Sequence, residues 1–278
     1  MDIRPSPIAG TWYPNQPKTL AQVVDQYLQA AEGSAPEGRP LAVLAPHAGL
    51  RYSGPVAGYS FNCLRGLHPK VIAVIGPMHH LHTAPLLTSA HEAYETPLGS
   101  MKVDREALDR VHHSLKETLG YGLTRVREDP EHSVEIELPF LQRVFGDFLL
   151  LPIMIVNQHL NVAEALGKAL AEALREKESL LVASSDLSHF YPQDVAQTLD
   201  SEVLRRIERF DPEGVLNAQD EGVGFACGRG AISAVLWAAR ALGASRVNIL
   251  RYGTSGDISS DFTSVVGYAA AAVSQAAA

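Results

Sequence analysis

Two histidines follow short apolar runs directly, in positions where an imidazole could bind a metal. His47 comes after LAVLA at residues 41–45 and His79 after VIAVI at residues 71–75, each behind a proline. Such runs are typical of strands buried on both faces of a parallel sheet, whose carboxyl ends meet at one ligand-binding edge. Neutral imidazole commonly ligates transition metals, and proline fixes how the chain leaves a strand, so the pair predicts a metal site. The alternative is two unrelated loop histidines that bond to backbone carbonyls.

A third apolar run also ends in polar side chains. Residues 179–184, SLLVAS, precede Asp186 and His189 within SSDLSH. A carboxylate and an imidazole three residues apart could ligate a metal, or the imidazole could transfer protons while the carboxylate orients it. A turn that caps the next helix, with His189 exposed, explains the same pattern equally well.

Cys227 lies in the glycine-rich segment FACGRG, just before a predicted helix. A helix N-terminus lowers the pKa of a thiol, so the position predicts metal ligation or nucleophilic reactivity. The alternative is a small buried residue, which is what most free cysteines are. Cys63, the second cysteine, lies on an apolar helix face and fits that alternative.

The acidic segment 128–137 contains His132 and Glu135. A charge run of this kind is usually a solvated loop, although HSVE near a helix start could face a cleft. His80 is expected to point away from a site that His79 enters. The other histidines receive no chemical role and are expected in turns, at the surface or on helix faces: His68, His82, His91, His112, His113 and His159.

The chain contains none of the common phosphate, zinc-protease or serine-hydrolase motifs: GxGxxG, GxxxxGK[ST], HExxH, a CxxC pair or GxSxG. Nucleotide-dependent chemistry therefore has no support in the sequence. Histidines with a cysteine or aspartate from separate strand ends point instead to a mononuclear metal site.

Composition excludes several kinds of partner. The formal net charge of −8 argues against a nucleic-acid or anionic-membrane surface. The chain contains no run of about 18 apolar residues, so we expect no membrane span. The first ten residues lack the apolar core of a signal peptide, and two cysteines cannot form a disulfide framework, so we expect a cytoplasmic location.

The elements that must position these residues alternate between strand and helix. The alternation predicts one α/β domain over residues 1–278, with a mixed sheet that is mainly parallel in its centre and flanked by helices on both faces. Pro152, inside the apolar run 148–156, predicts an edge strand or a bulge. Pro55 is expected in the first turn of its helix. Trp12 and Tyr13 are expected to hold the N-terminal arm on the body. Apolar spacing predicts helices over 18–32, 105–116, 133–144, 162–177, 194–209 and 231–242, and further strands at 93–96, 246–251 and 264–272.

Seven ordered motifs, spread over nearly the whole chain, resemble the Memo family, whose prokaryotic members are called AmmeMemoRadiSam system protein B. The motifs are AGTWYP at 9–14, APHAG at 45–49, YSGPVA at 52–57, GPMHH at 76–80, EHSVEIELPF at 131–140, SSDLSHF at 184–190 and CGRG at 227–230. The family is similar in fold to the class III extradiol ring-cleaving dioxygenases, which hold non-haem Fe(II) at strand ends. Met78 departs from the family, in which a small polar residue is commoner at that position.

The resemblance implies a ligand set and roles for the candidate residues. Metal would be held by His47, His79 and Cys227, with the cysteine where the dioxygenases have a carboxylate. His189 would transfer protons, and Asp186 and His132 would position it or the substrate.

The resemblance further implies a metal-dependent redox enzyme with Fe(II), or copper in its place, acting on dioxygen or a phenol-like small molecule, with Zn as a further possible metal outside the redox interpretation. The alternatives are a non-catalytic protein that holds metal or a peptide in the same cleft, and a Zn²⁺-dependent hydrolase. The family name implies an AMMECR-type protein and a radical-SAM protein as partners.

Overall fold

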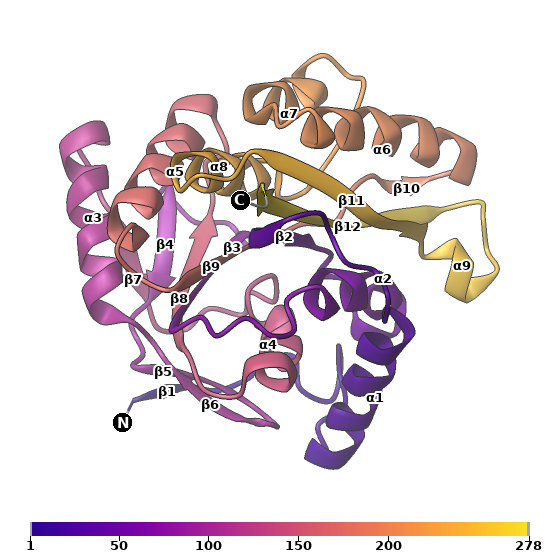
Figure 1. Ribbon diagram of the computed structural model, residues 1–278, viewed down its shortest axis with the longest axis horizontal. Coiled ribbons are helices and arrows are strands. Elements are labelled where there is room, and N and C mark those ends of the chain that lie inside the picture. The colour runs from indigo at the N-terminus through magenta and orange to yellow at the C-terminus, as the bar shows by residue number, and fades with distance from the viewer. Residues whose placement is uncertain (1, 277–278) are drawn as a thin grey trace.

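A mixed sheet of nine strands, within residues 2–276 that the structure describes, crosses the centre of the computed structural model (Figure 1). Its strands are β2 (Arg39–Ala45), β3 (Val71–Pro77), β4 (Leu86–Ser89), β7 (Thr124–Val126), β8 (Leu149–Ile155), β9 (Ser179–Ser184), β10 (His189–Tyr191), β11 (Arg246–Thr254) and β12 (Val265–Gln275). They lie in the order β10-β12-β2-β9-β3-β8-β4-β7, and β11 also pairs with β12.

The centre of this sheet is parallel. β2, β9, β3 and β8 run in the same direction, while β12 and β4 are antiparallel to the strands beside them. Every residue of β3 is buried, as a strand covered on both faces requires. The predicted α/β class, with a mixed sheet that is mainly parallel in its centre, is confirmed.

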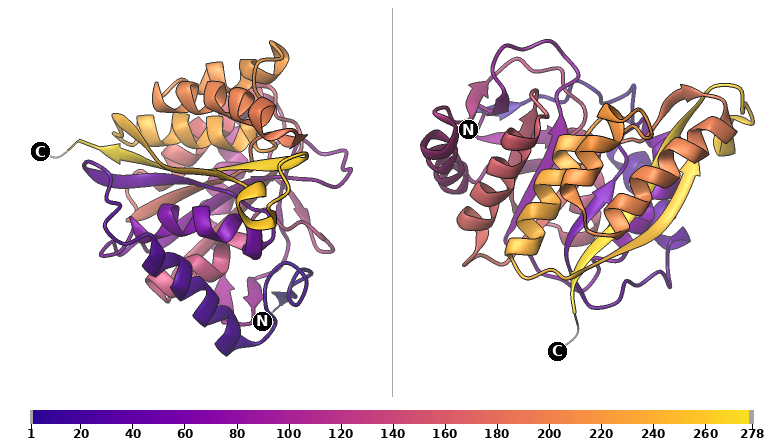
Figure 2. Two further views of the ribbon diagram at one scale, coloured as in Figure 1. Left: turned by 90° about the vertical axis from the view of Figure 1, so that its right-hand side faces the viewer. Right: turned by 90° about the horizontal axis from the view of Figure 1, so that it is seen from above.

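Helices cover both faces of the sheet (Figure 2). One layer contains α1 (Pro17–Ala30), α2 (Leu50–Asn62) and α4 (Leu138–Phe145), which the short 3₁₀ turn Glu135–Glu137 precedes. The other layer contains α3 (Arg105–Leu119), α5 (Leu160–Leu174), α6 (Gln193–Glu208), α7 (Pro212–Asp220) and α8 (Arg229–Ala241), and the small α9 (Gly256–Ser259) joins β11 to β12. No helix within residues 2–276 is long and apolar enough to cross a membrane.

The structure contradicts two expectations about prolines: Pro152 does not lie in an edge strand, and Pro55 does not lie in the first turn of its helix. Pro152 lies in β8, which is inside the sheet between β3 and β4. Its carbonyl accepts a hydrogen bond from the Thr88 hydroxyl at 2.7 Å, so its nitrogen faces the same side. β4 pairs only with Met154 and Ile155 of β8. The N–H that Pro152 lacks would therefore lie beyond the paired residues, where no hydrogen bond between the strands is lost.

Pro55 lies inside α2 rather than in its first turn, because the helix already begins at Leu50. α2, with Pro55 inside it, packs closely on α1. A Cβ on Gly58 would lie 2.4 Å from the Tyr27 carbonyl oxygen, so only glycine permits this approach.

A buried ion network holds the N-terminal arm. The arm contributes β1 (Ile3–Arg4) to a small sheet with β5 (Ala93–Thr96) and β6 (Gly99–Lys102). Arg4 is 1% exposed and forms ion pairs with Asp129 at 2.7 Å and Glu135 at 2.5 Å. Its guanidinium also donates to the carbonyl oxygen of Glu131 at 2.8 Å.

The acidic segment is therefore not the solvated loop that its charges suggest. Asp129, Glu131 and Glu135 are all buried, because an arginine some 125 residues earlier in the chain and several backbone N–H groups satisfy them. Tyr13 adds a hydrogen bond to Glu135 at 2.6 Å, which agrees with the expected anchoring of the arm.

Replacing Arg4 with alanine would leave the carboxylates of Asp129 and Glu135 buried without a cation. Removal of one partner from a buried ion pair typically costs about 3–5 kcal/mol, so we expect the free energy of unfolding to fall by that amount in urea denaturation. Arg110→Ala is the control, because it removes only an exposed pair with Glu106 and should cost less than about 0.5 kcal/mol. Equal costs for the two variants would contradict a structural role for the network.

Candidate metal and proton-transfer site

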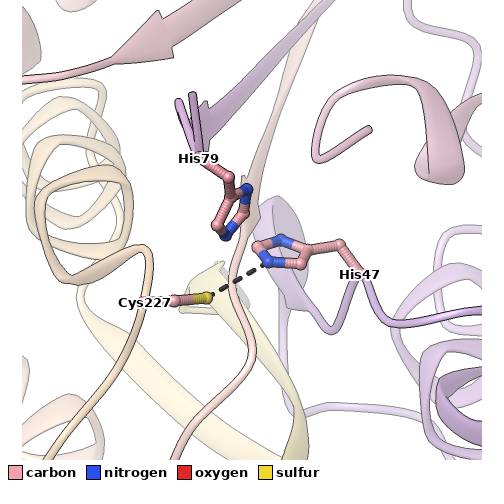
Figure 3. A group of neighbouring side chains, drawn as sticks. All are labelled: His47, His79 and Cys227. Carbon is pink, nitrogen blue, oxygen red and sulfur yellow. Dashed lines mark hydrogen bonds between the residues drawn. The ribbon is translucent and has the colours of Figure 1, made fainter. Parts of the chain in front are cut away.

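His47, His79 and Cys227 meet at the carboxyl edge of the sheet (Figure 3). One potential ligand atom from each lies within 4.8 Å of those of the other two. His47 Nε2 is 3.1 Å from Cys227 Sγ, and the two imidazole centroids are 5.1 Å apart with nearly perpendicular rings. The structure thus brings together three residues that the sequence places after β2, after β3 and just before α8.

His47 is held by Ser184, the last residue of β9, and by Asp186, which follows the strand. Its Nδ1 lies 2.9 Å from the Ser184 hydroxyl, and its backbone N–H donates to Asp186 Oδ1 at 2.8 Å. Asp186 also accepts from the backbone N–H of Ala48 at 3.3 Å. Burial raises the pKa of Asp186 to about 7, against the effect of these donors. The Asp186 carboxylate is therefore placed to fix the His47 loop.

His79 is oriented by Glu131, which sequence reasoning missed. Glu131 is 1% exposed, and its Oε1 lies 2.9 Å from His79 Nδ1 and accepts the backbone N–H of Ser133 at 2.8 Å. Burial opposes its ionisation, but hydrogen bonds and charge from His79, together with His132, hold the pKa of Glu131 below its ordinary range. Because an ionised carboxylate only accepts, His79 carries its hydrogen on Nδ1 and turns Nε2 toward the cluster.

His132 lines the same site and packs between two rings. Its imidazole stacks on His79 with centroids 4.5 Å apart and lies 4.0 Å from the Trp12 ring on the N-terminal arm. Burial lowers the pKa of His132 to about 4, so the ring is neutral at pH 7. Trp12 therefore does more than anchor the arm, since it forms a wall of the site.

His189 lies near the cluster but outside the group of three. Its Nδ1 donates to the Leu187 carbonyl at 2.8 Å, which leaves Nε2 as the basic nitrogen. Burial lowers its pKa, and its ring lies 5.7 Å from Phe225. The next residue, Phe190, has a positive φ of 65°, an unusual backbone conformation for a bulky side chain beside a candidate site.

The expected lowering of the Cys227 pKa was wrong. Desolvation raises the pKa of the thiol and the nearby Asp186 carboxylate adds to the shift, and both outweigh the helix terminus. The Asp186 N–H donates to the sulfur at 3.3 Å, and a polar pocket of about 330 Å³ lies beside it, lined in part by Gln158 and Arg229.

One histidine expected at the surface is buried as well. His91 is 8% exposed, with Nδ1 2.9 Å from an Asp2 carboxylate oxygen and Nε2 2.8 Å from the Arg127 carbonyl oxygen. It belongs to the anchor of the N-terminal arm and lies apart from the candidate site. Its sequence surroundings carry no signal of that contact.

The fold and the site together define an α/β protein with a His–His–Cys cluster at the carboxyl edge of a mainly parallel sheet. The family model described as Memo-like protein matches residues 4–272, and the chain therefore belongs to the Memo family. This confirms the resemblance stated from the motifs.

Curated relatives align over almost the full length of both chains. A MEMO1 family protein of Pyrobaculum aerophilum is 34% identical, with 97% of this chain aligned to 98% of that protein. One from Nitrosopumilus maritimus is 32% identical over 96% of this chain and 98% of its own. One from Methanosarcina acetivorans is 36% identical over 97% of this chain and 98% of its own.

Gly228 tests how tightly the cluster is packed. A Cβ there would lie 2.6 Å from the Ser184 carbonyl oxygen on β9, so Gly228→Ala forces backbone apart and should lower the free energy of unfolding by about 1–3 kcal/mol. Gly49→Ala is the matched control, because its added Cβ meets only the Trp12 carbonyl oxygen at 3.7 Å. We expect a change of less than about 1 kcal/mol for the control in the same thermal melts. A harmless Gly228→Ala would show that Cys227 is loosely held.

Proposed function

We propose that the chain is a metal-dependent redox enzyme in which His47, His79 and Cys227 hold one ion. Fe(II) is the preferred metal and copper is its alternative, whereas Zn²⁺, which has no redox chemistry, would suit only a hydrolase or a binding protein. The observation that carries the proposal is the grouping of two nitrogens and one sulfur within 4.8 Å. Imidazole and thiolate together suit late first-row transition metals.

The surroundings of the three donors fit an ion. Ser184 and Glu131 engage the Nδ1 atoms of His47 and His79, so the opposite nitrogens are the free ligands, as in most histidine metal sites. The thiol would lose its proton on ligation, because a metal ion outweighs the desolvation that raises its pKa. The His79 side chain is 31% exposed, which leaves an approach from solvent.

A bound iron or copper ion would supply Lewis acidity and electron transfer toward dioxygen or a phenol-like substrate. His189 would accept the proton of a substrate hydroxyl at Nε2, because burial lowers its pKa and so leaves Nε2 unprotonated at pH 7. His132 and Trp12 would exclude water from one side of the substrate. Asp186 would hold the His47 loop in place through its two backbone N–H contacts.

The rival proposal is a protein that holds metal or a peptide without turnover. The thiol in the cluster favours it, because thiolate suits tightly held Cu(I) and Zn²⁺. An AMMECR-type protein and a radical-SAM protein as partners, and a cytoplasmic location, belong to the proposal and rest on family membership and composition.

Metal content is the first test. Protein purified without oxygen should contain close to one iron or copper per chain by elemental analysis. Cys227→Ser and His47→Ala should each lose most of it, because each removes a ligand. Cys63→Ser, which changes the other cysteine, should keep it. Wild-type protein that neither contains nor takes up Fe(II), Cu(I) or Zn(II) would contradict the proposal of a metal site.

The role of His189 separates the enzyme from the rival. His189→Ala should retain the metal and lose at least about 100-fold in oxygen consumption with catechol as the probe substrate, the usual contribution of a general base. His113→Ala, at an exposed position on α3, is the control and should keep the wild-type rate. Metal-loaded wild type without turnover on any catechol would favour the binding protein.

A further inference from the structure

Glu137 is a buried acid that the proposed mechanism does not use. Its exposed fraction is 0%, and no basic side chain of residues 2–276 forms an ion pair with it. Oε1 lies 2.7 Å from the Ser184 hydroxyl, whereas Oε2 has no hydrogen-bond partner within the described chain. A carboxylate in this position would be a buried charge without compensation, which is strongly unfavourable.

The hydroxyl of Ser184 has three polar neighbours but only one hydrogen. They are the Ser133 carbonyl oxygen at 2.6 Å, Glu137 Oε1 at 2.7 Å and His47 Nδ1 at 2.9 Å. The carbonyl can only accept, so it takes the Ser184 hydrogen. The two lone pairs of the hydroxyl can then accept one hydrogen each, from Glu137 and from His47. All three contacts of the Ser184 hydroxyl can be hydrogen bonds only if Glu137 is protonated and His47 has its hydrogen on Nδ1.

We propose that Glu137 is a neutral carboxylic acid that acts through Ser184 as a positioning residue and holds His47 in the Nδ1–H tautomer. Burial raises the pKa of Glu137 well above its ordinary value, in agreement with the hydrogen count. Glu137 does not touch the cluster itself. The Ser133 carbonyl holds the Ser184 hydrogen and Glu137 fills one lone pair of the Ser184 oxygen, so the other lone pair accepts the His47 Nδ1 hydrogen and Nε2 presents its lone pair beside Cys227.

The consequence for ligation rests on the proposed function. A metal can bind His47 only through an unprotonated nitrogen, and the chain Glu137–Ser184–His47 keeps Nε2 in that state before any metal arrives. It thereby removes the need to move a proton on His47 when the ion binds. Ionised Glu131 keeps the hydrogen of His79 on Nδ1 by accepting it. One imidazole is therefore oriented by a charged acid and the other by a neutral acid.

Infrared spectroscopy of the metal-free protein tests the protonation. Wild type at pH 7 should show the carbonyl stretch of protonated carboxylic acids, and Glu137→Gln should lose the Glu137 band while the contribution of Asp186, whose pKa is about 7, remains. Asp200→Asn is the control, because Asp200 is another buried acid and lies outside this chain of hydrogen bonds. The Glu137 band must persist in that variant. If Glu137→Gln does not fold, Ser184→Ala should shift the band instead, and a spectrum without any acid band overturns the proposal.

Long-range ¹H–¹⁵N NMR of the metal-free protein reads the His47 tautomer. Wild type and Glu137→Gln, which keeps an N–H donor toward Ser184, should show hydrogen on Nδ1. Glu137→Leu removes one of the three contacts that fix the Ser184 hydroxyl, so its hydrogen can also turn from the Ser133 carbonyl toward His47, and we expect a mixture of tautomers. A wild-type tautomer in Glu137→Leu would overturn the positioning role.

Titration with Co(II) links the tautomer to the metal. Glu137→Leu should weaken binding about 10–100-fold, the usual effect of losing an outer partner of a metal ligand, while Glu137→Gln stays within about twofold. Equal affinities of wild type and Glu137→Leu would contradict the role of Glu137. A wild type that binds no Co(II) would count against the metal site alone, because the infrared and NMR measurements still decide the proton positions.

Discussion

The in-register pairing of three parallel strands is the constraint on which the site depends. β9 lies between β2 and β3, with Ala45 opposite Ser184 and Ile75 opposite Ala183. Strands about 4.8 Å apart that end in step release their chains side by side. His47 and His79 therefore leave the sheet on either side of Ser184. A slip of one residue in β9 would turn Ser184 to the other face and remove its contact with His47.

Orientation of the imidazoles then comes from buried polar groups, whose satisfaction connects distant parts of the chain. Arg4 on the N-terminal arm bonds to the backbone of Glu131, whose carboxylate orients His79. Trp12 on the same arm packs against His132. Arg4 and Trp12 of the arm thus support the site, because a buried carboxylate needs its donors as much as an imidazole needs its acceptor.

The sequence predicts what depends on local pattern. Apolar runs that end in a proline and a histidine identify the strand exits, and parallel packing brings those exits together. Glu131 escapes such reasoning because its neighbours in the chain are charged, while the groups that bury it come from Arg4 and the β3 exit. The expectation that a helix N-terminus lowers the pKa of Cys227 was wrong for a related reason. The helix dipole is a local effect, whereas the desolvation that raises this pKa depends on everything that packs around the sulfur.

Charge balance connects the acids around the cluster. In the proposed metal-bound form, the Cys227 thiolate and the Glu131 carboxylate would bring two negative charges near a divalent ion, and Asp186 is met by two backbone N–H groups. An ionised Glu137 would add a negative charge that no cation and no N–H donor offsets, in surroundings where an uncompensated charge is most costly. The neutrality that the hydrogen count assigns to Glu137 therefore keeps a further negative charge out of a site that already contains Cys227, Glu131 and Asp186. Each imidazole is oriented by an acid, His79 directly by ionised Glu131 and His47 through Ser184 by neutral Glu137, so that orienting the His47 ring adds no charge to the site.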